Sequence, residues 1–283
     1  VDPMKSLMRI GVDVLPAIPK DTTDRNRTSP LAFTGNKFEF RMLGSSQSVS
    51  EPNVALNTIM AEELGQFADI LEEATDFDAA LQHLVSKVFT DHQRIIFNGN
   101  GYSKDWAEEA ERRGLSNLAS TPKALATYLD QKNIDLVTKH GIYTEAEYRA
   151  RHEIHLEAYC KIINIEARTS IDMLLHQILP AAMAYTKSLC DSILAKKQIG
   201  LPCHAESSLA EKLSSTTDSC YKRCEKLRCD LENIPANSTD ASTYYHDIIV
   251  SEMANLRKDA DVLEQLTDKS YWPYPTYSDL LYY

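Results

Sequence analysis

A long stretch without glycine or proline sets the fold class of this chain. Residues 142–179 contain neither residue type, and such a stretch favours a continuous helix because both residues weaken helix interiors. Thr144 followed by Glu147 has the spacing of a capping box, which marks a helix start. Pro180 interrupts the stretch, but residues 181–197 continue in the same way. Since a proline can kink a helix without ending it, we predict a long helix that continues beyond Pro180.

Apolar residues at helical spacing predict further helices before and after this stretch. Asp76, Ser103 and Thr121 are suitable N-caps for three of them, because their side-chain oxygens can accept hydrogen bonds from the first turn. The predicted helices cover about residues 52–74, 76–89, 103–113, 121–139, 205–232 and 240–267. We expect the last two to pack their apolar stripes on each other. We also expect the aromatic tail, residues 271–283, to dock on the body or on a neighbouring subunit. The predicted fold class is mostly α, with long antiparallel helices.

Charge and hydropathy argue against two classes of partner. The chain has 30 Lys and Arg residues against 41 Asp and Glu residues, a net charge of −11, which argues against nucleic-acid binding. No apolar run approaches the roughly 18 residues that cross a membrane, and the N-terminus lacks the pattern of a signal peptide. We therefore expect a cytoplasmic protein whose six cysteines are free thiols. Because the chain begins at Val1, we expect it to be a piece of something longer.

The main candidate site lies within residues 21–47, where charged and aromatic side chains alternate. The run Lys37-Phe38-Glu39-Phe40-Arg41 has the period of two that is typical of a strand with one polar face. Lys37, Glu39 and Arg41 would then project on one side, with about 7 Å between neighbours. A carboxylate between two cations suits a hard metal ion and the phosphate or carboxylate groups of substrates. A solvated strand face with ordinary ion pairs has the same pattern, so the spacing alone leaves both interpretations open.

The identity of these residues indicates a family. Asn26-Arg27-Thr28-Ser29-Pro30 and the segment Phe33–Arg41 resemble the end of the catalytic domain of glutamine synthetases, in the long type III form. The resemblance continues through residues 94–102, 113–118 and 162–180 to the closing segment 272–281. It therefore spans almost the whole chain.

This resemblance implies a domain organisation. A short β element at about residues 31–43 would be left over from an α+β catalytic domain. Residues 1–75 would form the C-terminal end of that domain, and residues 76–283 the type III C-terminal helical domain. The family assembles into rings, so the resemblance also implies a large homo-oligomer.

The resemblance further implies ATP-dependent formation of glutamine from glutamate and ammonia, through γ-glutamyl phosphate. Glu39 matches the family's ligand for Mg²⁺ or Mn²⁺. Arg41 matches an arginine that contacts the glutamate substrate, and Arg27 one that steadies the phosphoryl group, so both would be catalytic and substrate-binding. Asn26 would bind substrate beside Arg27, and Lys37 would lie near the ATP phosphates.

Two departures from the family pattern affect this expectation. Ala32 occupies a place where type I enzymes have an arginine, so the phosphate contacts would differ in detail. The family's other metal ligands and its nucleotide pocket belong to sequence upstream of the residues present here. We therefore expect the parent protein to be a glutamate–ammonia ligase and the isolated chain to be inactive.

Two other classes of function remain open from the residues. The helical part fits an oligomerisation or interaction module with no catalytic role. A zinc site is the second alternative, because Cys220 and Cys224 share a helix face and Cys203-His204 would add ligands. His152 and His155, three residues apart, form a further candidate metal pair.

Overall fold

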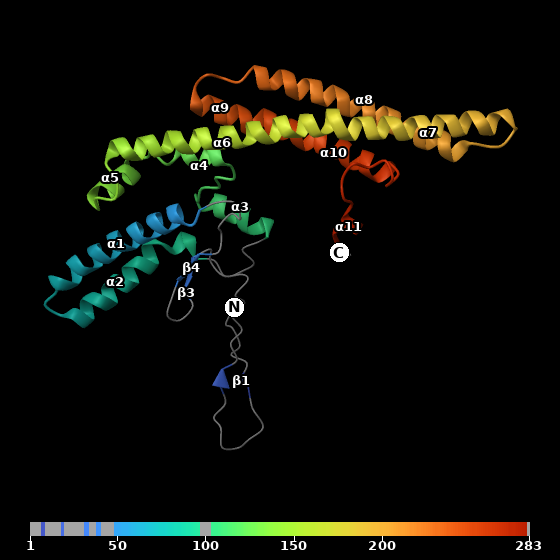
Figure 1. Ribbon diagram of the computed structural model, residues 1–283. Coiled ribbons are helices and arrows are strands. Elements are labelled where there is room, and N and C mark those ends of the chain that lie inside the picture. Colours follow the sequence, from blue (N-terminus) through green and yellow to red (C-terminus); the bar gives the residue numbers. More distant parts are fainter. Residues whose placement is uncertain are drawn as a thin grey trace. The chain divides into compact units, whose positions relative to one another are not determined.

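The structure, a computed structural model, describes residues 48–96 and 103–281, apart from the side chains of residues 277 and 278. Before residue 48 it describes only the backbone of four short strands. The chain divides into two compact units, Val1–Asn117 and Leu118–Tyr283. The elements are labelled in Figure 1. The described residues are mostly helical, as the sequence predicts.

The first unit contains the strands, which pair as two antiparallel ribbons. β1 (Leu7–Met8) pairs with β2 (Ile18–Pro19), and β3 (Leu31–Phe33) pairs with β4 (Phe38–Phe40). β3 and β4 lie within residues 31–43, where the sequence predicts a β element.

Two helices of the first unit begin at the N-caps that the sequence predicts. The helices of this unit are α1 (Ser50–Glu72), α2 (Phe77–Asp91), the short 3₁₀ helix η2 (Gln93–Ile95) and α3 (Lys104–Arg112). The two N-caps are Asp76 for α2 and Ser103 for α3. The Asp76 carboxylate accepts a hydrogen bond from the backbone N–H of Ala79 at 3.1 Å, and the Ser103 hydroxyl accepts one from Trp106 at 3.4 Å. α3 ends before Gly114, whose φ of +73° favours glycine.

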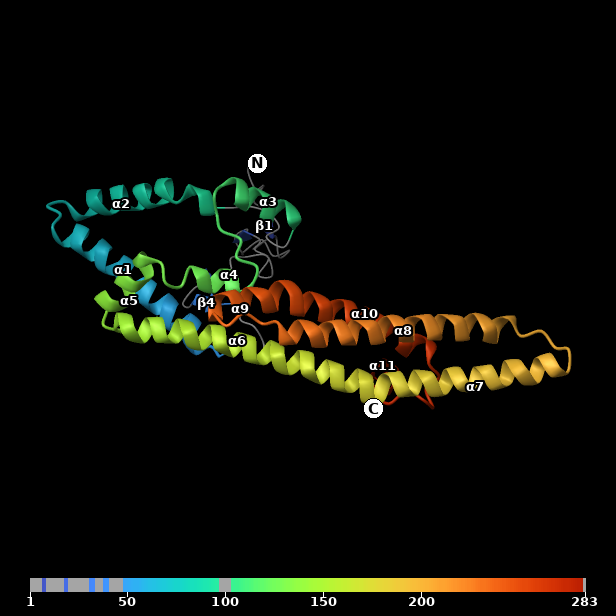
Figure 2. The ribbon, with the colours of Figure 1, turned by 90° about the horizontal axis from the view of Figure 1, so that it is seen from above.

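One long helix dominates the second unit. α6 (Glu145–Met173), the π-helical turn η3 (Leu174–Ile178) and α7 (Leu179–Gln198) follow one another without a break. Figures 1 and 2 show them as one continuous rod. At 1.5 Å per residue the rod is roughly 80 Å long. The capping box of Thr144 and Glu147 is confirmed, and so is the continuation past Pro180.

The π turn explains how the rod tolerates its proline. In η3 the backbone N–H of Leu179 donates to the carbonyl of Leu174, five residues earlier. A proline has no N–H to donate, and its ring crowds the preceding turn of an α-helix. The wider turn directly before Pro180 relieves this crowding, so the helix continues.

One helix prediction is wrong. The sequence predicts a single helix over residues 121–139, whereas the structure has α4 (Thr121–Ala126), with Ser120 rather than Thr121 as N-cap, and α5 (Gln131–Lys139). Tyr128, in the break between them, stacks on Tyr148 of α6 with 4.2 Å between the ring centroids. It also packs in a small cluster around Ile134 and Val137. These tertiary contacts outweigh the local helical preference.

Two more helical segments complete the second unit. α8 (His204–Glu232) runs back along α7. α9 (Ser238–Tyr244) packs on α6, and the π turn η4 (Tyr245–Ile249) and α10 (Val250–Leu266) pack against α8. The predicted helices 205–232 and 240–267 are thus confirmed, with their bounds displaced by no more than two residues. Figure 2 shows α7 and α8 side by side.

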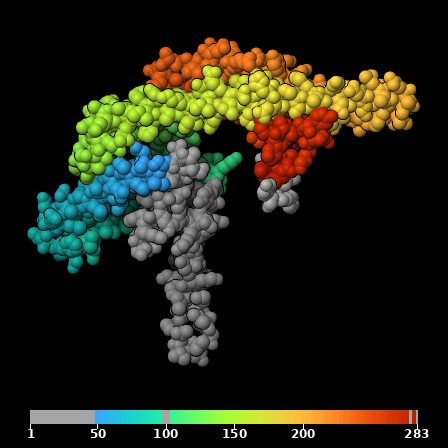
Figure 3. Space-filling view, viewed as in Figure 1, coloured from blue at the N-terminus to red at the C-terminus, as the bar shows by residue number. Residues whose placement is uncertain are grey.

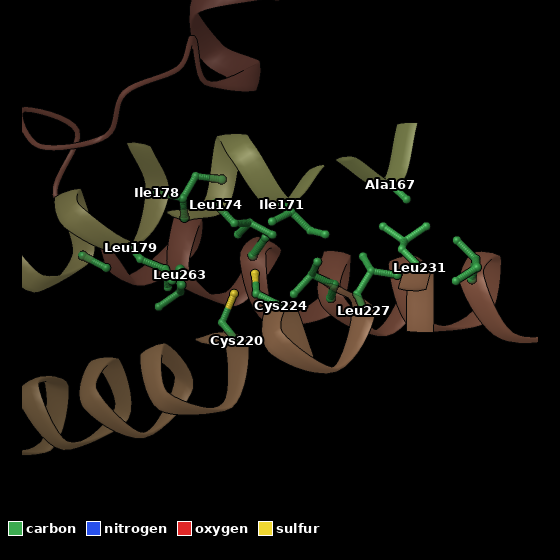
Figure 4. Packing of buried hydrophobic residues seen from close by; sticks show 14 of the residues in the cluster. Ala167, Ile171, Leu174, Ile178, Leu179, Cys220, Cys224, Leu227, Leu231 and Leu263 are labelled. Carbon is green, nitrogen blue, oxygen red and sulfur yellow. The ribbon is translucent and has the colours of Figure 1, made fainter. Parts of the chain in front are cut away.

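The core of the second unit lies between these helices. α6, η3 and α7 contribute Ala167, Ile171, Leu174, Ile178, Leu179 and Ala182. α8 contributes Leu213, Cys220, Cys224, Leu227 and Leu231, and the last helical segment contributes Tyr245, Ile249, Leu256, Ala260 and Leu263. Figure 4 shows the labelled side chains of α8 meeting those of α6 and η3. Burial of these apolar side chains supplies most of the stabilisation of the unit.

A polar bridge connects α8 to α10 beside this core. Asp259 accepts hydrogen bonds from the Ser219 hydroxyl at 2.8 Å and from Nε of Arg223 at 2.9 Å. Lys226 makes a second ion pair across the same helices, with Glu252. These contacts fix how the two helices align along their length.

The aromatic tail docks on the second unit, as the sequence predicts. Trp272 and Tyr274 pack against the core, and the ring of Tyr271 lies 5.3 Å from that of Tyr185 on α7. Figure 3 shows the tail, coloured red, lying against the long helix. The tail ends in the short helix α11 (Tyr277–Leu281).

Candidate functional site

The predicted catalytic site lies almost wholly outside the described residues. Asn26, Arg27, Lys37 and Arg41 are not described, and of Glu39 only the backbone is described. Glu39 is in β4, where the register places it opposite Ala32 of β3. The shared face of Lys37, Glu39 and Arg41 therefore stays a prediction.

Arg113 organises the end of the first unit. Its Nη1 donates to the carbonyl of Ile96 at 2.8 Å, and its guanidinium lies 5.7 Å from the centre of the Trp106 ring. Glu109 accepts hydrogen bonds from both Arg112 and Arg113, which lower the pKa of its carboxyl group to about 2. The arrangement joins α3 to the chain that follows α2, and we assign it a structural role.

α2 carries an apolar stripe that no described residue of the first unit covers. Phe77, Leu81, Val85 and Phe89 are spaced by four residues, so they lie on one helix face, and each is more than a third exposed. Leu84, by contrast, is buried. We call these four residues the α2 stripe, and a stripe of this kind is typical of a helix that packs on another surface.

The structure separates the residues of the proposed zinc site. Cys220 and Cys224 are fully buried in the core, one turn apart on α8, whereas Cys203 is the N-cap of the same helix. About sixteen residues of helix place Cys203 and His204 roughly 24 Å from Cys220, which is far beyond any common coordination sphere. The hydrogen bond with Cys224, together with burial, raises the pKa of the Cys220 thiol. The two thiols are packing residues.

The two candidate histidines of α6 also have structural surroundings. His152 is 7% exposed, and its ring centre lies 6.1 Å from that of Tyr128. The ring of His155 meets the edge of the same tyrosine at 5.8 Å. Both therefore belong to the aromatic cluster that breaks the helix between α4 and α5.

A pocket that the sequence does not indicate lies in the second unit. It has a volume of about 400 Å³ and is bounded by the end of α6 with η3, by α10, and by the aromatic tail. The residues that line it include Met173, Leu174, Met253, Leu256, Trp272 and Tyr274. No motif identifies these positions, because they come together only when the tail folds back over the π turn.

The described residues supply neither a metal cluster nor a membrane span. Among residues 48–96 and 103–281 no group of three or more His, Cys, Asp or Glu side chains is arranged to hold a metal ion. Over the described part of the chain, no helix combines enough length and apolar character to cross a membrane.

Comparison with known proteins gives consistent similarities. The family described as the glutamine synthetase C-terminal domain matches residues 80–197, from α2 into α7. The type-3 glutamine synthetase of Dictyostelium discoideum is 39% identical over 286 residues, which cover 97% of this chain and 39% of that relative. The glutamine synthetase of Butyrivibrio fibrisolvens is 35% identical over 93% of the chain and 38% of its own length.

A third relative extends the pattern. The glutamine synthetase of Bacteroides fragilis (strain YCH46) is 32% identical over 98% of the chain and 40% of its own length. The chain thus spans about 40% of the length of each of these relatives. It is homologous to the type-3 glutamine synthetase over most of its own length, and residues 80–197 match the glutamine synthetase C-terminal domain.

Proposed function

We propose that this chain contributes part of the active site of a glutamate–ammonia ligase, in which ATP drives glutamine formation through γ-glutamyl phosphate. The observation that carries the proposal is the 39% identity to a type-3 glutamine synthetase over 97% of the chain, together with the Asn26-Arg27 and Lys37–Arg41 motifs. Residues 1–75 would belong to the catalytic domain and residues 76–283 to the helical domain.

The charged residues of the motif have distinct proposed roles. Arg41 binds the glutamate substrate, and Arg27, next to the substrate-binding Asn26, neutralises the phosphoryl group during its transfer. Lys37 binds the ATP phosphates. Fixed positive charge that is already in place before the reaction stabilises such a transfer without reorganisation.

Glu39 is the proposed ligand for Mg²⁺ or Mn²⁺. A bound divalent ion would supply charge neutralisation at the phosphates. Hard cations take about six oxygen ligands, and Glu39 supplies at most two, so the residues present in the motif do not complete a metal site. We therefore propose that the isolated chain does not turn over, and that the complete site forms with the remaining 60% or so of the relatives' length.

A chimera tests this proposal. The chain replaces the homologous section of the Dictyostelium type-3 glutamine synthetase, and phosphate release is measured with ATP, glutamate, ammonium and Mg²⁺ or Mn²⁺. We expect activity in the chimera, loss of about a hundredfold or more in Glu39→Gln, and no change in Glu63→Gln, an exposed glutamate on α1. An intact chimera without glutamate-dependent turnover would refute the proposal. Turnover by the isolated chain would refute the proposal that its active site is incomplete.

A helical interaction module is the second candidate, and the α2 stripe favours it. Exposed apolar residues at a spacing of four are costly to leave in water. In a synthetase, a second subunit or the catalytic domain would cover the stripe, and a cytoplasmic homo-oligomer of rings would follow from the family's habit.

The oligomeric state tests the second candidate. In the interaction-module view the isolated chain assembles, and Phe89→Glu on the α2 stripe dissociates it in sedimentation velocity. A monomeric chain whose Phe89→Glu variant is unchanged would contradict this second function and leave the catalytic proposal to the chimera.

A further inference from the structure

The pocket of the second unit is a preformed apolar cavity. At about 400 Å³ it is within the usual range for small-molecule sites. Its floor and walls are mostly hydrophobic. The apolar and aromatic residues that line it are Met173, Leu174, Ile178, Met253, Leu256, Ala260, Trp272, Pro275 and Leu280.

Two structural features hold this pocket open. The π turn η3 adds one residue to a helical turn, so Leu174 and Ile178 contribute both to the core and to the pocket wall. π turns of this kind are frequent at functional sites. The tail forms the opposite wall, and it is fastened by an ion pair between Lys269 and Asp279.

A cap at the start of α11 adds to this fastening. Asp279 accepts hydrogen bonds from the backbone N–H and the hydroxyl of Thr276, at 2.9 and 2.8 Å. The tail segment that carries Trp272 and Tyr274 is therefore closed on itself at Asp279, and it contacts the body through those two side chains.

The pocket has few polar groups, and their net charge is negative. Arg257 pairs with Asp261. Glu264, a half-buried residue of the lining, has no hydrogen bond or ion pair to any described residue. The hydroxyl oxygen of Tyr274 is buried and also has no hydrogen-bond partner among the described residues. One positive and two negative side chains line the pocket, so its formal charge is −1.

We propose that this pocket binds an organic ammonium ion with a bulky apolar body. The apolar walls bury the body, at about 25 cal/mol for each Å² removed from water. The ammonium group pairs with the Glu264 carboxylate, and the Trp272 ring attracts the same charge. The site lies in the helical unit and does not depend on the proposed ligase activity.

Three probes of one shape and different charge test the proposal. They are 1-adamantylmethylammonium, the neutral 1-adamantylmethanol and the anionic 1-adamantanecarboxylate, none of which absorbs where tryptophan emits. The chain has two tryptophans, so Trp106→Phe leaves Trp272 as the reporter. We expect saturable emission changes, with the ammonium probe binding at least about tenfold more tightly than the carboxylate, which corresponds to about 1.4 kcal/mol.

Two variants assign the effect to the pocket. Glu264→Gln should reduce the preference for the cation to less than about threefold, since the amide keeps the shape and removes the charge. Glu211→Gln, at an exposed position of α8, should leave the preference unchanged. Isothermal titration calorimetry gives the same affinities without the tryptophan reporter, and circular dichroism verifies that each variant is folded.

Three results would overturn the proposal. They are no saturable binding of the ammonium probe, equal binding of all three probes, and a cation preference that survives in Glu264→Gln. If a second copy of the chain occupied the pocket, Trp272 emission would depend on protein concentration, and the probes would not compete with that copy. That pattern also excludes the proposed ligand.

Discussion

Replacing Leu227 by alanine tests the core of the helical unit. Leu227 is fully buried on α8, in the cluster that joins α8 to the long helix, and Figure 4 shows it there. The substitution removes three carbon atoms, which are worth about 2.4 kcal/mol in transfer from water. The cavity left behind adds to this, and comparable substitutions cost about 3 to 5 kcal/mol of unfolding free energy.

The matched control is Leu194→Ala on α7. Leu194 is 60% exposed, so its removal creates no cavity, and we expect a change within about 0.5 kcal/mol. Urea unfolding followed by circular dichroism at 222 nm measures both variants. In thermal unfolding Leu227→Ala should lower the midpoint by at least about 6 °C, given roughly 2 °C per kcal/mol for a unit of this size.

A loss below about 1 kcal/mol for Leu227→Ala would refute this account of the core. Equal losses for the two leucines would do so as well. The first result would mean that the cluster collapses around the missing side chain. The second would mean that the outer face of α7 is covered by another surface.

Three further substitutions follow from the same structure. Asp259→Asn removes the charge that holds Arg223 across α8 and α10, and it should cost about 1 kcal/mol in urea unfolding, because both side chains are partly exposed. The hydrogen bond from Lys269 is the chief cause that lowers the carboxyl pKa of Asp279 from 3.8 to about 2. The stability that this carboxylate contributes is present above its ordinary pKa and is lost as the pH falls through about 2. Tryptophan emission should therefore change between about pH 4 and pH 2, and Asp279→Asn should abolish that change. Gly141→Ala forces a φ of +62° on a residue with a Cβ and should cost about 1 kcal/mol in urea unfolding.

Controls distinguish these effects from general damage. Asp218→Asn, at an exposed position of α8, should leave urea unfolding unchanged, and a loss equal to that of Asp259→Asn would contradict the bridge. Gly65→Ala, inside α1 with open space around the new Cβ, should stabilise α1 by about 0.5 to 1 kcal/mol. A gain in both glycine variants would contradict the backbone argument at Gly141.

Features that depend on neighbouring residues in the sequence were predictable. Asp76 and Ser103 cap the helices that follow them, and Thr144 forms its capping box with Glu147. Each of these devices is complete within four residues, so the sequence contains all of its parts. The rod through Pro180 was predictable for the same reason, since its helical pattern is continuous on both sides.

The features that the sequence did not predict depend on contacts between distant residues. The break between α4 and α5 depends on Tyr128 meeting Tyr148, twenty positions away in the sequence. The candidate zinc site is wrong because residues that are near one another in the sequence lie far apart in the structure. α8 separates Cys203 from Cys220 along its length. The catalytic residues were predicted by motif alone, and Glu39 is the one of them whose backbone pairing is described.

The π turn lies in the long helix, which the sequence predicts, and it also lines the pocket, which the sequence does not predict. Pro180 indicates in the sequence that the long helix is strained near residue 180, but not how the strain is relieved. The inserted residue widens the helix at Leu174–Ile178. α7 stays packed on α8, and Leu174 and Ile178 lie beside the aromatic tail. The pocket is therefore a consequence of how one proline is accommodated, and its ligand chemistry depends on the charges that α10 places at its edge.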